Sequence, residues 1–134
     1  MEPQLPINEL PKLGGPEAEV CPSGVHSHDR LRHVVCDLRQ IERAAGMFRA
    51  MGDPARMHIL VLLMDQECCV SELVEHLGEK NSTISQRLKI LHTEGLLRRR
   101  RDKSHLYYSL ADDHVRDLVR NMMAHAAESH AHND

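Results

Sequence analysis

The sequence predicts a mainly α-helical fold with one small β-hairpin, and three observations support this class. Apolar residues recur at helical spacing in five segments between Leu31 and His130. One pair of short, β-prone stretches flanks a charged turn after Gly95. The 134 residues include no Trp, one Phe and two Tyr, so aliphatic and Met side chains must build the core, which suits packed helices.

The chain divides into a short arm and one domain. Residues 1–30 are acidic and rich in Pro and Gly, which predicts a flexible N-terminal arm, and residues 31–134 are long enough for one domain. We find no signal-peptide pattern and no apolar run long enough for a bilayer, so we expect a cytoplasmic, bacterial protein without membrane contact. The four cysteines would then be reduced thiols or metal ligands rather than disulfides.

Two helices are predicted in the first half of the domain. An apolar stripe over 31–51 predicts the first helix, which Gly52 ends. Asp53 is a plausible N-cap of the second helix, 54–64, and Pro54 suits its first position, where a missing N–H costs nothing.

The next two helices form a recognisable pair. A short helix over 70–77 ends at Gly78, and a second helix begins at Asn81 or Ser82 and runs to Glu94. A short helix, a tight connection and a second helix that begins with small polar residues are typical of a helix-turn-helix.

A hairpin and a last helix complete the domain. Residues 96–110 predict two strands with a charged tip over 101–104, and a helix follows over 113–130. A hairpin directly after a helix-turn-helix is a wing, so the predicted fold is a winged helix-turn-helix.

The charge distribution indicates a nucleic-acid partner. The whole chain has a net charge of −3, but seven basic and two acidic residues give 81–110 a net charge of +5. Such a basic block is typical of phosphate binding, although a solvated charge run is the plainer alternative. Arg and Gln can also read base edges in the major groove. The residues predicted to contact DNA are Ser82, Thr83, Ser85, Gln86, Arg87, Lys89, Arg100, Arg101 and Lys103.

Four residues of the last helix are a candidate metal site. Asp112, His114, His125 and Glu128 are two carboxylates and two imidazoles, the ligand types of a tetrahedral zinc site. His114 and His125 share one helical face, but a helix separates them by about 16 Å, too far for one ion. Antiparallel pairing with a second copy would bring the two halves together, so the motif predicts a metal and a homodimer at once. The alternative is a solvated amphipathic helix.

In its motifs the sequence resembles the ArsR/SmtB family of bacterial metal-sensing repressors, closest to the zinc-sensing branch. The likeness covers roughly residues 38–130. It is carried by five motifs in order, namely Met51–Arg56, Glu67–Leu73, Ser82–Leu88, Tyr107–Leu110, and Asp112-x-His114 with His125-x-x-Glu128.

The resemblance implies a repressor rather than an enzyme. The metal-free homodimer would bind an inverted-repeat operator in double-stranded DNA, and Zn(II) would release it to derepress metal efflux or sequestration genes. Cd(II), Co(II) and Cu(I) are alternative ligands. A zinc enzyme is disfavoured because no HExxH motif is present and the four ligands already close a tetrahedron.

The family has a second metal site that joins the arm to the Cys-rich segment before the short helix. In this chain the site would use Cys21, Cys68, Cys69 and His26. The position where the family motif usually has its second Cys is occupied by Ser71. Thiolates favour soft ions. The alternative function is therefore a winged-helix repressor controlled by cysteine oxidation or by soft metals at this site. In the plainest interpretation, Cys68 and Cys69 are small core residues.

Overall fold

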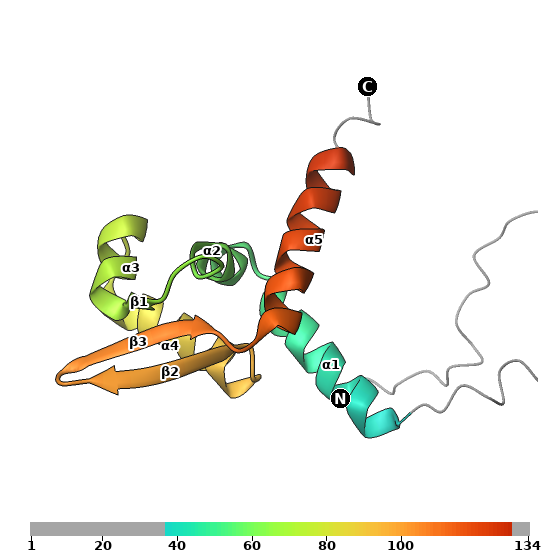
Figure 1. The fold of residues 1–134 in the computed structure, drawn as a ribbon, viewed down its shortest axis with the longest axis horizontal. Coiled ribbons are helices and arrows are strands. Elements are labelled where there is room, and N and C mark those ends of the chain that lie inside the picture. The colour runs from blue at the N-terminus through green and yellow to red at the C-terminus, as the bar shows by residue number, and fades with distance from the viewer. Residues whose placement is uncertain (1–36, 130–134) are drawn as a thin grey trace, which may run out of the picture. The chain divides into compact units, whose positions relative to one another are not determined.

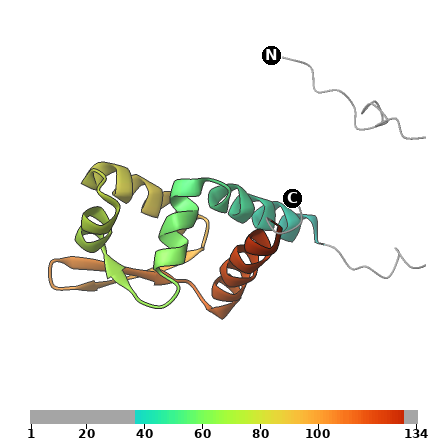
Figure 2. The same ribbon diagram turned by 90° about the horizontal axis from the view of Figure 1, so that it is seen from above.

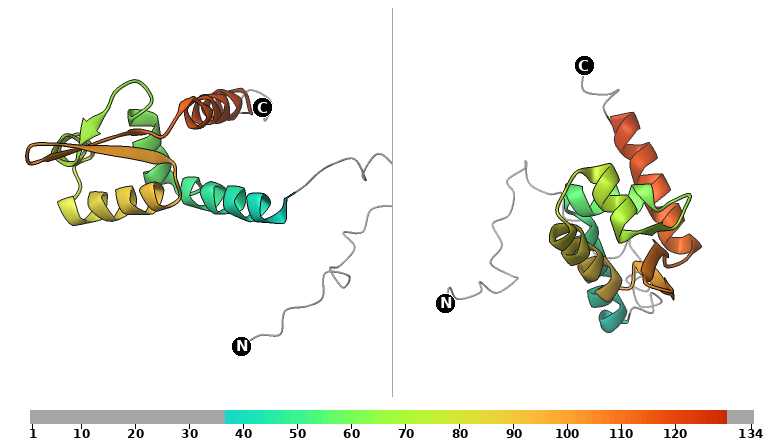
Figure 3. Two further views of the ribbon diagram at one scale, coloured as in Figure 1. Left: turned by 60° about the horizontal axis from the view of Figure 1, so that its bottom comes forward. Right: turned by 90° about the vertical axis from the view of Figure 1, so that its left-hand side faces the viewer.

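The computed structural model describes residues 37–129, and their arrangement is drawn in Figures 1 to 3. The mainly helical class with one hairpin is confirmed, whereas the arm and the first residues of the expected helix 31–51 lie outside the described residues. The elements are α1 (Leu38–Met51), α2 (Pro54–Leu62), β1 (Cys68–Cys69), α3 (Val70–Leu77), α4 (Asn81–Thr93), β2 (Leu97–Asp102), β3 (His105–Leu110) and α5 (Asp113–Ser129).

Side-chain caps fix the corner between α1 and α2. The Asp53 carboxylate accepts a hydrogen bond from the backbone N–H of Arg56 at 3.0 Å, and Pro54 occupies the first turn, as predicted. The guanidinium of Arg56 turns back and donates from Nε to the Ala50 carbonyl at 2.7 Å. One short segment thus satisfies backbone groups at the end of α1 and at the start of α2.

The end of α2 differs from the prediction. The helix stops at Leu62 rather than at Met64, because the N–H of Met64 bonds the carbonyl of Val61, three residues back. Such a bond tightens the last turn and ends the regular α-helical pattern.

A third strand joins the predicted hairpin. The sheet order is β1-β3-β2, with Cys68 opposite Tyr108 and Cys69 opposite Tyr107. The sequence did not predict β1, because two residues are too few to show an alternating pattern. The hairpin turn is also tighter than expected, since the strands continue to Asp102 and resume at His105.

Glycines end both helices of the helix-turn-helix as predicted. Gly78 follows α3 with φ 66°, and Gly95 lies just beyond α4 with φ 78°. This left-handed backbone is accessible to glycine at little cost. In the left view of Figure 3, α4 and the hairpin extend in the same direction from the turn that joins α4 to β2.

The core is mostly aliphatic, and all five helices and the sheet contribute side chains to it. Val119 connects α5 to it, whereas every residue from Arg120 to Glu128 is exposed. Among residues 37–129, no helix combines the length and apolar character needed to cross a bilayer. Among residues 37–129, the largest fully buried side chains are Ile59, Leu60, Leu63, Leu73, Ile84, Leu88, Leu91, Leu96, Leu110 and Val119.

Candidate functional site

Helix α4 has a buried apolar side and an exposed polar side. Ile84, Leu88 and Leu91 are fully buried, which fixes the rotation of the helix about its axis. The hydroxyl of Ser85 donates to the amide oxygen of Asn81 at 3.2 Å, across the exposed first turn. Of the residues predicted to contact DNA, Ser82, Ser85, Gln86 and Lys89 are exposed, and Thr83 and Arg87 are half-buried.

The wing carries the densest positive charge of the described part of the chain. All four arginines of β2, 98–101, are exposed, and so is Lys103 in the turn. Lys103 has φ 57°, a left-handed conformation that costs a residue with a Cβ about 1–2 kcal/mol. The predicted contacts Arg101 and Lys103 therefore lie at an accessible tip.

Arg100 occupies a different environment from its neighbours. Its Nε donates to both carboxylate oxygens of Glu67, at 2.9 and 3.1 Å, and its Nη2 also pairs with that carboxylate. The guanidinium carbon lies 4.6 Å from the centre of the Tyr107 ring, within cation–π distance. The hydrogen bond from Arg100 lowers the pKa of Glu67 below its ordinary value of 4.5. These contacts tie the wing to the segment before β1.

Arg87 also has a carboxylate partner. Its Nη1 lies 2.7 Å from Oε2 of Glu79, which belongs to the connection between α3 and α4. The hydrogen bond to Glu79 is the main cause that raises the pKa of Arg87. The sequence predicts neither carboxylate as a partner of these arginines, and Glu67 lies 33 residues from Arg100, beyond the reach of any spacing rule.

Asp112 caps the last helix. Its Oδ1 accepts from the backbone N–H of Val115 at 3.0 Å, and its Oδ2 lies 3.7 Å from Nδ1 of His114. The hydrogen bond from Val115 is the main cause that lowers the pKa of Asp112 below 3.8. The His114 side chain is 97% exposed, so both side chains are accessible and Asp112 is held as an anion.

The other two candidate metal ligands lie near the far end of α5. His125 and Glu128 are exposed and are separated from Asp112 and His114 by most of a continuous helix. Within residues 37–129, no three His, Cys, Asp or Glu side chains are grouped closely enough to hold an ion. A single copy therefore places Asp112 near His114, and His125 one helical turn from Glu128, but it does not bring the two pairs together.

Arg116 connects α5 to the segment that follows α2, and no pattern in the sequence indicates this contact. Its Nε donates to the carbonyl of Met64, just beyond α2, at 2.8 Å. Its Nη1 pairs with Asp113 at 2.5 Å. This arginine lies two residues after His114, so the first half of the candidate metal site is close to a direct bond with the segment that follows α2.

The two described cysteines face different hollows. Cys68 packs into the core and lines a hollow with Glu72 and His76, whereas Cys69 lines one with Ser71 and His105. Adjacent strand residues point to opposite faces, so the two thiols do not converge. Burial raises the pKa of the Cys68 thiol, which disfavours the thiolate that a metal or oxidant needs.

Cys69 has a structural role at the start of α3. Its Sγ lies 3.0 Å from Oγ of Ser71 and 3.1 Å from Oε1 of Glu72, and its N–H also bonds Glu72. The bond from the Cys69 N–H to the Glu72 carboxylate and the bond from the Glu72 backbone N–H to the Cys69 side chain together form a capping box. The remaining members of the expected thiolate site, Cys21 and His26, lie outside the described residues, so that site stays a prediction.

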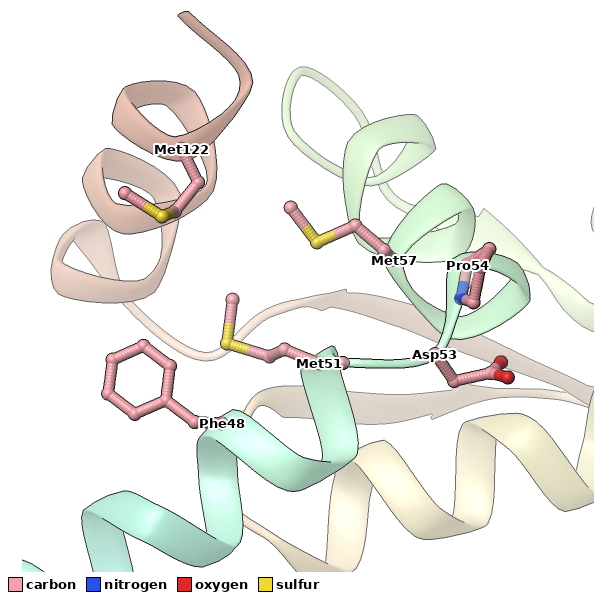
Figure 4. A pocket seen from close by; sticks show the side chains of 7 residues that line it. Phe48, Met51, Asp53, Pro54, Met57 and Met122 are labelled. Carbon is pink, nitrogen blue, oxygen red and sulfur yellow. The ribbon is translucent and has the colours of Figure 1, made fainter. Parts of the chain in front are cut away.

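Large apolar side chains are exposed on both α1 and α5. Phe48 is 53% exposed and Met122 is 44% exposed, unusual values for large apolar side chains. Both line a hollow of about 360 Å³ between α1, the start of α2 and α5, into which Met51 and Met57 also point (Figure 4). A second apolar hollow lies between α1 and the first turns of α5 and includes His114. We call the exposed residues Leu38, Ile41, Phe48, Met122 and Met123 the α1–α5 apolar face.

Comparison with known proteins identifies relatives with this architecture. Residues 53–99 match the family described as bacterial regulatory protein, arsR family. A Synechocystis protein, transcriptional repressor SmtB homolog, is 34% identical over 84% of this chain and 88% of its own length. A Staphylococcus aureus protein, cadmium resistance transcriptional regulatory protein CadC homolog, is 33% identical over 63% of this chain and 70% of its own length.

A solved structure matches most of the described fold. It is the homodimeric winged helix-turn-helix DNA-binding domain of a Mycobacterium bovis protein, with a TM-score of 0.66 and 27% identity. The match covers 72% of this chain and 87% of that domain. The winged helix-turn-helix class is thereby confirmed.

Proposed function

The chain belongs to the ArsR/SmtB family of DNA-binding transcriptional regulators, which are not enzymes, and from this premise we propose that it is a metal-released repressor. The metal-free homodimer binds an inverted-repeat operator, and Zn(II) binding to α5 weakens the complex. The observation that carries the proposal is the division of four ligands between the two ends of one helix whose second half is exposed on every side.

The exposed side of α4 and the wing support the DNA-binding part of the proposal. The helix-turn-helix places the second helix in the major groove, and a dimer contacts two half-sites about one helical turn apart. Ser82, Ser85 and Gln86 are accessible for base or phosphate contacts, and Arg101 and Lys103 for phosphates. Arg100 is a poorer candidate than its neighbours because Glu67 and Tyr107 already hold its guanidinium.

The α1–α5 apolar face supports the homodimer. Exposed Phe48, Met122 and Met123 would lose water contact if a second copy covered them. Self-association through one patch gives a two-fold symmetric pair, which also matches a symmetric operator. The homodimeric Mycobacterium bovis domain has the same fold.

The donor set fits zinc. Two imidazoles and two carboxylates complete a tetrahedral shell, and the name of the Staphylococcus aureus relative associates it with cadmium resistance. We propose that Asp112 and His114 of one copy and His125 and Glu128 of the other hold one Zn(II), with Cd(II) or Co(II) as alternatives. Asp112 can offer Oδ2 while Oδ1 keeps the helix cap.

Release of DNA requires only that zinc prefers the conformation that binds DNA weakly. By linkage, bound DNA must then weaken zinc binding by the same factor. A contact that could carry this coupling starts beside the site, because Arg116 joins the first turn of α5 to Met64 in the segment between α2 and β1.

Mixed dimers test the shared site. One chain carries Asp112→Ala and His114→Ala, and the other carries His125→Ala and Glu128→Ala. Each mutant homodimer should bind no zinc at this site, whereas a mixed dimer regains one complete site, because one chain keeps the first pair and its partner keeps the second. Zinc is counted by competition with a chromophoric chelator. Failure of the mixed dimer to recover zinc would exclude a site shared between copies.

A further inference from the structure

The ion pair between Glu79 and Arg87 joins the segment before the proposed DNA-binding helix to the middle of that helix. Arg87 belongs to α4, and Glu79 lies two residues before that helix begins. The contact joins Nη1 to Oε2 at 2.7 Å, and the two side chains remain 23% and 38% exposed. Both groups can therefore be reached by a ligand that approaches the surface.

We propose that Glu79 is an intramolecular competitor of DNA phosphate for Arg87, so that it weakens DNA binding by the free protein. The inference rests on the proposed function, since it needs Arg87 at the DNA interface. It assigns Glu79 a role in setting affinity, although the carboxylate itself binds no DNA.

The position of Glu79 favours competition. A helix N-terminus attracts phosphate through its unpaired N–H groups and its dipole. The N-cap residue of α4, Lys80, provides no side-chain hydrogen bond to that first turn. Glu79 directly precedes Lys80 and pairs with Arg87, so a negative charge lies close to the start of this helix and to its arginine. Asp53 adds a weaker negative field at Arg87.

Arg87 and Arg100 are each paired with a carboxylate, but Arg100 is held more firmly than Arg87. Arg100 bonds its carboxylate through two nitrogens and also lies over the Tyr107 ring. Within residues 37–129, Arg87 pairs with one carboxylate and uses one terminal nitrogen. A single exposed ion pair contributes little to folding and exchanges its partner readily. Arg87 can therefore leave Glu79 for a phosphate, at a cost that reduces the net gain from binding.

The test is a double-mutant cycle on DNA binding. Wild type, Glu79→Gln, Arg87→Gln and the double variant are titrated by fluorescence anisotropy on a duplex from upstream of the gene, at several salt concentrations and without metal. A scrambled duplex runs in parallel, and circular dichroism verifies folding. Glu75→Gln is the matched control, because Glu75 is an exposed carboxylate of α3 that forms no ion pair within residues 37–129.

We expect Glu79→Gln to tighten binding about two- to fivefold, the range of an exposed ion pair. The dependence of log K on log salt should stay close to that of wild type, because Arg87 neutralises the same phosphate in both complexes. In the Arg87→Gln background the same substitution should have a much smaller effect, and Glu75→Gln should have little effect.

Three outcomes would overturn the inference alone. If Glu79→Gln tightens DNA binding equally in the wild-type and Arg87→Gln backgrounds, or if Glu75→Gln tightens it as much, then the loss of any negative charge is enough to explain the effect. Unchanged binding would mean that the pair is irrelevant to DNA. Weaker binding would mean that Glu79 holds Arg87 in place for DNA. If wild type binds the two duplexes equally or not at all, the proposed function fails and the inference fails with it.

Discussion

The Oδ1 atom of Asp112 accepts a hydrogen bond from the backbone N–H of Val115 at 3.0 Å, so the first candidate metal ligand is also the N-cap of α5. Metal binding and helix stability therefore depend on the same side chain. A substitution that keeps the cap but removes the charge can separate the two roles.

Asp112→Asn should separate them. Asn caps a helix about as well as Asp, whereas its neutral amide is a poor zinc ligand. We expect the variant to keep the melting temperature of the metal-free protein to within a degree or two and to lose zinc affinity at least tenfold. Asp112→Ala should lose both zinc affinity and several degrees of melting temperature. Equal melting temperatures for Ala and Asn would contradict a capping role.

The Glu67–Arg100 pair predicts one acid-sensitive contribution to stability. Because Arg100 lowers the pKa of Glu67 in the folded state, its contribution is present above the ordinary value of 4.5 and is lost as pH falls through the lowered value. Urea unfolding of wild type and Glu67→Gln between pH 7 and pH 3 measures it. We expect the difference between the two proteins to be constant above about pH 5 and to shrink below about pH 4.5. A difference that grows as pH falls would have the wrong sign.

Lys103→Gly should change folding and DNA binding in opposite directions. Glycine relieves the left-handed backbone strain at φ 57°. It also raises the conformational entropy of the unfolded chain, which offsets part of this gain, so the free energy of unfolding should rise by about 0.5 kcal/mol. Loss of a cation at the wing tip should weaken DNA binding and reduce the salt dependence by about one. Lys103→Arg is the control that keeps charge and strain. Unchanged DNA binding by Lys103→Gly would remove this residue from the interface.

Arg116→Gln should uncouple the two proposed sites. The substitution removes the bond to the Met64 carbonyl without touching the four candidate ligands. We expect zinc affinity and metal-free DNA affinity within about twofold of wild type, but a zinc effect on DNA that is several times smaller. Arg120→Gln is the matched control, because Arg120 pairs only with Asp117 of its own helix within the described residues. An undiminished zinc effect would assign Arg116 to structure alone.

Local rules predicted much of the fold. The Asp53 cap, Pro54 in the first turn, and glycines 78 and 95 each act over a few residues, so the sequence displays them directly. Strand β1 depends on a partner about 40 residues away, and its two residues show no period. The strand could be found only from its pairing with Tyr107 and Tyr108.

The candidate site was predictable to a different degree. Spacing along α5 identified His114 and His125 as members of one set, since a helix fixes their relative positions. It could not reveal the carboxylates that hold Arg87 and Arg100, nor the bond from Arg116 to Met64, because these depend on tertiary packing. It also could not show that Cys68 and Cys69 face different hollows, which depends on the local strand.

The central claim is that metal on α5 releases DNA, and one titration tests it most directly. Reduced, metal-free protein is titrated by fluorescence anisotropy onto the inverted repeat upstream of its gene, with and without Zn(II). We predict tight metal-free binding that zinc weakens by about tenfold or more, a coupling of about 1.4 kcal/mol, and that His114→Ala abolishes the zinc effect while keeping the binding. Tight binding that is the same with and without zinc would contradict the account.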